Sequence, residues 1–308
     1  MKNQPTISGA AEHVAEVLRP QEVPHGPRTW QTDGGTTRNF LNNRFVYVLV
    51  SPRAHGLSVG INMNPDKRCN FDCVYCEVNR TLPARDQSLD VPVMIGELET
   101  TLALALERRL HGLPGFQSLP AELLQLRHVA LSGDGEPTLS PCFAEALHAV
   151  VHLRAVCRFP FFKIVLLSNA TGLDQPGVQQ SLHALMPQDE VWLKLDGGTR
   201  AYLDRINRPQ VPLEKVLENI LVIARLRPVV IQSLFPCLNG EEPPAEEIEQ
   251  YLMRLRELKE AGARISLVQV YSATRPPRHP ECGHLPLKSL SKIAQAVRAG
   301  TGLRVEVF

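Results

Sequence analysis

Short apolar runs alternate with helix-like segments along most of this chain, and this alternation limits the fold more than any other feature. Between the runs, apolar residues recur every three or four positions, as Leu98, Leu102 and Leu106 do, which is the spacing of one helix face. Strands that alternate with helices form βαβ units, and these units build parallel sheets. The runs occupy residues 45–50, 57–63, 129–131, 164–167, 191–195, 229–234, 265–270 and 303–308. The sequence therefore predicts an α/β fold, a partial (β/α)6 barrel with parallel strands and a core at about 57–272.

No internal repeat, low-complexity tract or linker divides the 308 residues. We therefore expect a single barrel domain over residues 45–308. Its short C-terminal extension is predicted to be a helix at about 287–299, which ends at Gly300, followed by the last strand. Residues 1–44 contain paired glycines and several polar residues, and we expect them to form an irregular N-terminal cap.

The composition is that of an ordinary globular protein, with 44% hydrophobic and 21% charged residues. Lys and Arg number 33 and Asp and Glu number 32, so a strongly basic nucleic-acid binder is not indicated. No run reaches the about 18 apolar residues that a membrane span needs, and no secretory signal is visible near the start. The seven cysteines are an odd number, which argues against a disulfide framework. We expect a cytoplasmic protein in a reducing compartment.

Polar and charged residues are concentrated where the apolar runs end. In a parallel α/β fold the carboxyl ends of the strands share one face, and binding sites form there. A charged side chain at the end of a buried strand also needs a partner or a ligand. The residues in question are Ser132 to Glu136, Ser168, Asn169, Lys194, Asp196, Gln232, Ser233, Tyr271 and Ser272. These segments, together with a loop rich in cysteine, are predicted to meet at one mouth of the barrel.

Three of the seven cysteines, Cys69, Cys73 and Cys76, lie within eight residues in a C-x-x-x-C-x-x-C spacing. Thiolates are soft ligands that suit zinc or iron–sulfur centres. A structural zinc site needs four protein ligands, and no fourth is evident nearby. Three thiolates can instead hold three irons of a 4Fe–4S cluster, which leaves the fourth iron open to an exogenous ligand. The spacing alone also fits a zinc knuckle or incidental thiols.

In this combination, the cysteine motif and six other segments resemble the radical S-adenosylmethionine (radical SAM) superfamily. The resemblance extends from about Leu57 to Tyr271, and the branch that it most resembles is that of the tRNA wyosine-base synthases and their uncharacterised bacterial relatives. The segments that carry it are G-x-N-x-x-P at Gly60–Pro65, CNFDCVYCE at Cys69–Glu77, SGDGEPTL at Ser132–Leu139, SNATG at Ser168–Gly172, LKLD at Leu193–Asp196, INRP at Ile206–Pro209 and VQVYSATRPP at Val268–Pro277.

The resemblance implies a 4Fe–4S cluster and S-adenosylmethionine as cofactors. Cys69, Cys73 and Cys76 would ligate three irons, and the amino and carboxylate groups of S-adenosylmethionine would bind the fourth. The other cofactor-binding residues that it implies are Tyr75 near the adenine, Gly133, Asp134, Gly135 and Glu136 near the methionyl amino group, and Ser168 and Asn169 at the ribose or carboxylate. Lys194, Asp196 and Gln232 are expected at the same site because of their places at the ends of buried strands.

The mechanism that the resemblance implies is reductive cleavage of S-adenosylmethionine to a 5′-deoxyadenosyl radical, which abstracts hydrogen from a substrate. No flavin domain is recognisable, so the electron donor is expected to be a separate flavodoxin- or ferredoxin-like protein. Cys237 is a candidate hydrogen donor or radical relay. Arg208 and Arg275, in the INRP and TRPP segments, are candidates for binding an anionic substrate, because guanidinium groups suit phosphate and carboxylate.

The sequence departs from the wyosine-base synthases at one point. Those enzymes bind a second cluster through N-terminal cysteines, and residues 1–68 of this chain contain no cysteine. This departure argues against the tRNA reaction, so RNA, a peptide and a small metabolite all stay open as substrates. The alternative to an enzyme is a non-catalytic iron–sulfur or zinc-binding scaffold that retains only the barrel.

Overall fold

Six parallel strands form the centre of the molecule and confirm the predicted partial (β/α)6 barrel. The computed structural model describes residues 36–37, 40–156, 159–274 and 279–308. Each of the six strands pairs with the next one along the chain. They are β3 (Gly56–Asn62), β4 (Leu126–Ser132), β5 (Lys163–Ser168), β6 (Glu190–Lys194), β7 (Val229–Leu234) and β9 (Ile265–Tyr271). This order places all of their carboxyl ends on one side of the sheet.

Further strands extend this sheet at both edges. At one edge β2 (Val46–Ser51) pairs antiparallel with β3, and β1 (Thr36–Thr37) pairs antiparallel with β2. At the other edge β11 (Val305–Val307), the last predicted strand, pairs parallel with β9. A separate two-stranded sheet consists of β8 (Cys237–Leu238) and β10 (Cys282–Gly283). Most of the predicted N-terminal cap lies outside the described residues.

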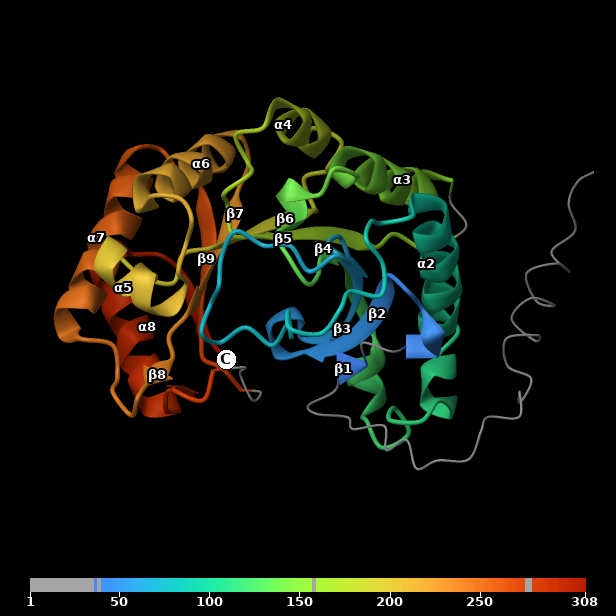
Figure 1. Ribbon diagram of the computed structural model, residues 1–308, viewed down its shortest axis with the longest axis horizontal. Helices are drawn as coiled ribbons and strands as arrows, with labels where there is room; N and C mark the ends of the chain where they lie inside the picture. The colour runs from blue at the N-terminus through green and yellow to red at the C-terminus, as the bar shows by residue number, and fades with distance from the viewer. Residues whose placement is uncertain (1–35, 38–39, 157–158, 275–278) are drawn as a thin grey trace, which may run out of the picture.

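Seven α-helices in the described part of the chain cover the outside of the curved sheet, in an arc that Figure 1 shows from α2 through α4 to α8. They are α2 (Val91–Leu106), α3 (Phe143–Ala155), α4 (Pro176–Leu182), α5 (Arg200–Ile206), α6 (Leu213–Leu226), α7 (Ala245–Glu260) and α8 (Leu287–Thr301). Short 3-10 helices occur at Phe40–Asn42, Pro52–Ala54, Arg109–Gly112, Ala121–Leu124 and Pro137–Leu139. The loop after β3, which carries the three cysteines, crosses in front of the strands before it reaches α2.

The end of α8 differs from the sequence-based prediction. The helix continues through Gly300 and stops at Gly302, whose φ of 67° is the left-handed conformation that glycine adopts at low cost. At Gly300 the absence of a side chain serves packing instead, because a Cβ there would lie 2.8 Å from Cδ2 of Leu252 in α7. The sequence analysis therefore predicted the correct type of helix end, but it chose Gly300 where the structure uses Gly302.

The strand at 57–63 was predicted from its alternation of apolar with small or polar residues, and the structure shows both of its faces covered. Val59 and Ile61 are fully buried in the main core, while Ser58 and Gly60 on the other face are buried as well. Tyr47 of β2 lies opposite Gly60, and a Cβ on Gly60 would come within 2.2 Å of the Tyr47 ring. The small residues of β3 therefore make room on the inner face of the barrel.

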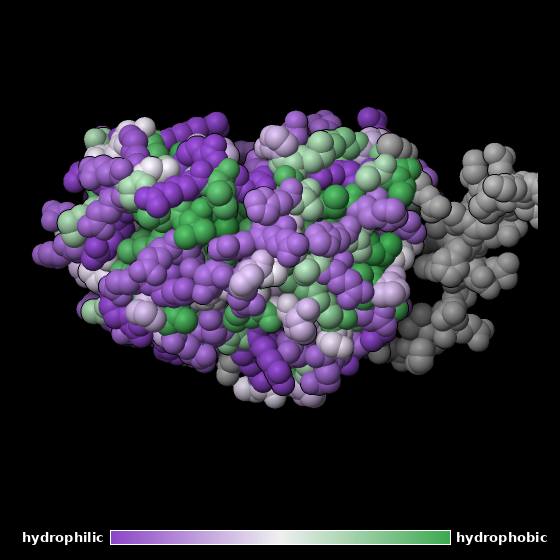
Figure 2. Space-filling model, turned by 90° about the horizontal axis from the view of Figure 1, so that it is seen from above, coloured by the Kyte–Doolittle hydropathy of each residue, from purple (hydrophilic) through white to green (hydrophobic). Residues whose placement is uncertain are grey.

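The surface is mainly polar, as Figure 2 shows for the face seen from above, with apolar patches between the charged side chains. Leu82, Leu226 and Leu287 are the most exposed of the large apolar side chains in the described residues. Among those residues, no helix is both long enough and apolar enough to cross a membrane.

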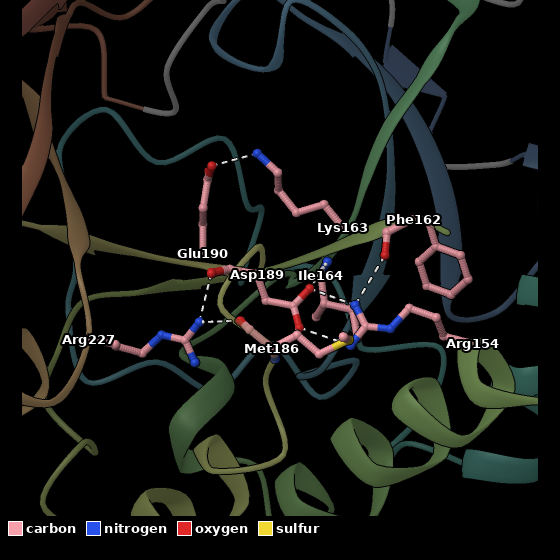
Figure 3. Close-up of polar contacts among 8 residues, drawn as sticks. All are labelled: Arg154, Phe162, Lys163, Ile164, Met186, Asp189, Glu190 and Arg227. Carbon is pink, nitrogen blue, oxygen red and sulfur yellow. Dashed lines mark hydrogen bonds and ion pairs between the residues drawn. The ribbon is translucent and has the colours of Figure 1, made fainter. Parts of the chain in front are cut away.

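A buried ion pair fixes the end of the barrel that lies opposite the cysteine loop (Figure 3). Arg154, in the last turn of α3, donates to both oxygens of Asp189, with N–O distances of 2.6 and 2.9 Å. The Asp189 side chain is fully buried and also accepts from the backbone N–H groups of Ile164 and Met186. The carboxylate therefore connects α3, the start of β5 and the turn before β6.

We expect Asp189→Asn to lower the free energy of unfolding by about 3–5 kcal/mol, because it leaves the buried Arg154 without its counter-charge. The matched control is Glu190→Gln at the next position, whose ion pair with Lys163 is about one-third exposed. That change should cost at most about 1 kcal/mol. Urea unfolding of both variants tests the difference, and equal losses would show that the buried pair has no special weight.

Candidate active site

A cavity of about 370 Å³ opens at the carboxyl ends of the parallel strands and continues along the inner face of the barrel. Residues from the cysteine loop, from β2 to β6 and from the end of β9 line it. Most of the predicted site residues are among them: Cys69, Cys73, Tyr75, Cys76, Gly133, Asp134, Gly135, Glu136, Ser168, Asn169 and Lys194. Most of the segments that were expected to meet at one mouth of the barrel do so, but Gln232 and Ser233 do not line the cavity.

Each of the three clustered thiols has a nitrogen donor beside its sulfur. Asn169 Nδ2 lies 4.0 Å from Sγ of Cys69, and Asn207 Nδ2 lies 3.3 Å from Sγ of Cys73. The third donor is Arg80, whose Nη1 lies 3.5 Å from Sγ of Cys76. Hydrogen bonds to the sulfurs are one of the means by which proteins adjust the potential of an iron–sulfur cluster.

The thiols have to lose protons before they can bind iron. Burial raises the pKa of Cys73 to about 11, although Lys194 and Asn207 act in the opposite direction, and burial also raises the pKa of Cys69. Metal binding at these sulfurs is therefore coupled to proton release. In the described part of the chain, no three His, Cys, Asp or Glu side chains form a group that would hold one metal ion. Three soft donors around a cavity fit a cluster in which each thiolate binds a different iron.

Two glycines allow the loop after β4 to lie directly against the cysteine loop. Gly133 has a φ of +134°, and a Cβ on it would lie 2.3 Å from Oδ1 of Asn62. A Cβ on Gly135 would lie 1.8 Å from the backbone oxygen of Arg68, the residue before the first cysteine. Asn62 also binds Asp134 by two hydrogen bonds of 2.9 Å. Its Oδ1 accepts from the backbone N–H of Asp134, and its Nδ2 donates to the Asp134 carboxylate.

The Glu136 carboxylate joins the loop after β4 to the end of β5. It is buried, and it accepts from the hydroxyls of Ser168 and Thr138 and from the backbone N–H groups of Asn169 and Thr138. Burial raises the pKa of Glu136, and these hydrogen bonds oppose that effect. Both of its oxygens thus accept hydrogen bonds from protein groups, and the carboxylate positions Ser168 and Asn169 at the cavity.

A second buried carboxylate, Asp196, holds Tyr75 of the cysteine loop. It accepts from the Tyr75 hydroxyl, from Asn207 Nδ2 at 2.8 Å and from the backbone N–H of Leu234 at 2.8 Å. Lys194 Nζ donates to the same hydroxyl at 3.1 Å and lies 4.6 Å from the centre of the Tyr75 ring. Asp196 does not line the cavity, but it fixes a ring that does.

Three further predicted residues also lie outside the cavity lining. Gln232 is buried and donates to Gln269, outside the cavity lining. Cys237 lies on β8, opposite Gly283 of β10, and is not a lining residue either. Arg208 forms ion pairs with Asp72 and Glu281, at 3.4 and 3.5 Å. Arg275 falls outside the described residues.

The sequence analysis did not select several residues that the structure places at the site. Asn62 and Asn207 lie within the quoted G-x-N-x-x-P and INRP segments, so the motifs contained a signal for both. Arg80 stands four residues after Cys76 without such a signal. The inner wall of the cavity includes Tyr47, Ser58, His128 and Trp192. These last residues occur inside ordinary strand patterns, and only the curvature of the sheet brings them together.

His128 is a buried histidine on that inner wall. Its Nε2 lies 2.8 Å from the Ser58 hydroxyl, and its ring meets the Trp192 ring edge-on at 5.4 Å between centroids. Burial lowers the pKa of His128 to about 4. The imidazole is therefore neutral near pH 7, and this part of the cavity is aromatic and uncharged.

Comparison with known proteins gives a consistent result. The family model described as the radical SAM superfamily matches residues 63–252. A UPF0026 protein of Helicobacter pylori is 24% identical over 277 residues, which cover 84% of this chain and 82% of that protein.

Solved structures share the fold at low sequence identity. The structure of TYW1 with a lysine-pyruvate adduct bound has a TM-score of 0.51 and 14% identity, with 83% of this chain and 84% of that chain covered. Streptococcus suis SuiB bound to S-adenosylmethionine has a TM-score of 0.55 and 13% identity, with 83% and 52% covered. These likenesses agree with the resemblance that the motifs indicate.

We expect the stability of the protein to fall as the pH drops below about 6.5, in part because of His128. The unfolded chain binds a proton on this residue near its ordinary pKa, whereas the folded protein does so only near pH 4. Between pH 7.5 and pH 5 this difference removes about 2 kcal/mol of stability. Urea unfolding should show a smaller loss for His128→Gln over the same interval, and identical losses would contradict the burial effect.

We expect Gly135→Ala to lose nearly all bound iron after anaerobic reconstitution, because the new methyl group collides with the backbone of Arg68. The control is Gly96→Ala on the exposed side of α2, where an added Cβ meets nothing within 4 Å. It should keep its iron and gain about 0.5–1 kcal/mol in helix stability. Full iron content in Gly135→Ala would show that the contact between the two loops is dispensable.

Proposed function

The chain belongs to the radical SAM superfamily, and we propose that it cleaves S-adenosylmethionine reductively to start radical chemistry on a substrate that is not yet identified. Members of this superfamily use a 4Fe–4S cluster and S-adenosylmethionine, and these are the cofactors of this enzyme. The observation that carries the proposal is the meeting of three thiols, with a nitrogen donor beside each, at one cavity.

The cluster would be held by Cys69, Cys73 and Cys76. The donor set supports this assignment, because three thiolates leave one iron of a 4Fe–4S cluster without a protein ligand. The N–H groups of Asn169, Asn207 and Arg80 point to sulfurs that are thiolates in the loaded protein, and such charge-assisted hydrogen bonds are the stronger kind.

S-adenosylmethionine would bind along the carboxyl ends of β4, β5 and β6. In this proposal the loop Gly133–Glu136 and the pair Ser168 and Asn169 hold its polar amino acid and ribose groups. Tyr75 would lie near the adenine, with its hydroxyl fixed by Asp196 and Lys194. The fixed ring matters, because a positioned group orients a ligand more strictly than a mobile one does.

When bound, the reduced cluster and S-adenosylmethionine supply a 5′-deoxyadenosyl radical that abstracts a hydrogen atom from the substrate. The contribution of the chain is to position the cofactors and to shield the cavity from water by its buried walls. The electron would come from a separate flavodoxin- or ferredoxin-like protein, since reductants are a general need of the superfamily.

Two features bear on the substrate. The absence of cysteine from residues 1–68 argues against the two-cluster tRNA reaction, although tRNA stays among the substrates to test. Arg208 is engaged by Asp72 and Glu281, so any binding of a substrate anion by this side chain would compete with two carboxylates. For Cys237 we retain a role as hydrogen donor only as a proposal, since it lies on β8 outside the cavity lining.

We expect the anaerobically reconstituted protein to release 5′-deoxyadenosine when dithionite and S-adenosylmethionine are present. Cys73→Ser should lose both the iron and this product, because it removes one of only three protein ligands. Cys142→Ser, which changes a half-buried thiol outside the cavity, should retain both. Iron analysis and chromatography of the product provide the measurement. One zinc and no iron in the anaerobically purified protein would instead favour the scaffold alternative.

A further inference from the structure

Arg53 lines the cavity, and none of the described residues forms an ion pair with it. It lies in the 3-10 helix Pro52–Ala54, after β2, and its guanidinium is 4.1 Å from the ring centre of Tyr271 at the end of β9. Within the residues that the structure describes, no carboxylate lies within ion-pair distance of Arg53, and its side chain takes part in no hydrogen bond. A half-buried cation in that situation has an unused ability to bind an anion.

This arginine stands at the seam where the two edges of the curved sheet approach each other. Tyr271 ends β9, which lies next to the edge strand β11, and the segment that carries Arg53 follows β2, which lies next to the edge strand β1. His55 continues the contact, with its ring 5.7 Å from that of Phe308 and its Nε2 3.6 Å from a carboxylate oxygen of Glu306. In the described part of the chain no strand pairing joins the two sides of the sheet here, and the contacts of Arg53 and His55 connect them beside the cavity.

A second cation, Lys194, faces the same cavity from the end of β6. The Arg53 and Lys194 side chains line the same cavity and carry charges of the same sign. Three carboxylates line the cavity too. Asp134 is bound by Asn62, Glu136 is bound by the Ser168 and Thr138 hydroxyls, and Glu77 is exposed to solvent. An anionic group placed between the two cations would relieve their repulsion and supply the partner that Arg53 lacks.

The wall that continues inward from this point has a different character. Trp192 and the neutral His128 present aromatic surface, and the Ser58 hydroxyl is hydrogen-bonded to His128. Ligand sites of this type bind an apolar or planar body through such surface and fix its orientation by a few polar groups.

We propose that Arg53, together with Lys194, binds the anionic head of a small organic substrate, a carboxylate or a phosphate, whose body lies against Trp192 and His128. The inference rests on the proposed function, because it places the substrate beside the S-adenosylmethionine site. It assigns substrate recognition to Arg53 and its surroundings, a role that binding of the cofactors does not require. Arg53 is a binding residue in this account and takes no part in cleavage of S-adenosylmethionine.

The test uses the reconstituted full-length protein with S-adenosylmethionine present and three probes of similar shape. Benzoate and phenyl phosphate carry the two anionic heads on a planar body, and benzamide is the neutral counterpart of benzoate. Calorimetric titration should show benzoate or phenyl phosphate binding at least about tenfold more tightly than benzamide, as expected for a hydrogen-bonded charge pair. Comparison of the two anions distinguishes a carboxylate substrate from a phosphate.

The variants locate the effect. Arg53→Gln should abolish the preference for the anion, and Arg53→Lys should retain part of it. Arg109→Gln, which removes an exposed arginine outside the cavity lining, should bind as the unchanged protein does. Equal binding of benzoate and benzamide, or unchanged binding by Arg53→Gln, would overturn the proposal. So would a protein that binds bulk tRNA through Arg53 but neither small anion.

Cofactor readouts separate this inference from the proposed function. Arg53→Gln should keep its iron and release 5′-deoxyadenosine at the same S-adenosylmethionine concentration as the unchanged protein. If the variant instead needs about tenfold more S-adenosylmethionine, Arg53 binds the carboxylate of the cofactor, and the substrate assignment is wrong. If the unchanged protein forms no 5′-deoxyadenosine at all, the proposed function fails, whatever the anion titrations show.

Discussion

The buried carboxylate of Asp196 is the interaction on which the site depends. It receives hydrogen bonds from Tyr75 in the cysteine loop, from Asn207 after α5 and from the backbone of Leu234 at the end of β7. A buried charge is stable only when it is paired or hydrogen-bonded, so the three donors and the carboxylate need one another. These contacts fix the cysteine loop on the barrel.

A second set of contacts fixes the other side of the same loop. Asn70 accepts from Asn169 Nδ2 at 2.9 Å and donates to Thr171 Oγ1 at 2.8 Å, which connects the residue after Cys69 to the end of β5. The missing side chain of Gly135 lets the loop after β4 approach the backbone of Arg68. The loop is thus supported from β4, β5, β6 and β7, and a preorganised site of this kind keeps its ligands near their working geometry.

The sequence was sufficient to predict the fold class and many of the residues that line the cavity, because both follow from local patterns. Apolar runs and helical spacing predict the parallel sheet, and the family resemblance of the cysteine motif implies the cluster ligands. What was not predictable depends on the curvature of the sheet. The contact of Arg53 with Tyr271 joins residues more than two hundred positions apart, and nothing in either segment indicates the other. Gly300 and Gly302 show the same limit on a smaller scale, since only the packing of α8 on α7 distinguishes them.

The central claim is that three thiolates hold a cluster with one iron open to S-adenosylmethionine at this cavity. Mössbauer spectroscopy of the protein reconstituted with ⁵⁷Fe tests it most directly, because this method distinguishes individual iron sites. The account predicts that the signal of a single iron out of four changes when S-adenosylmethionine is added. Four irons that all stay unchanged, or a centre without four irons, would contradict it.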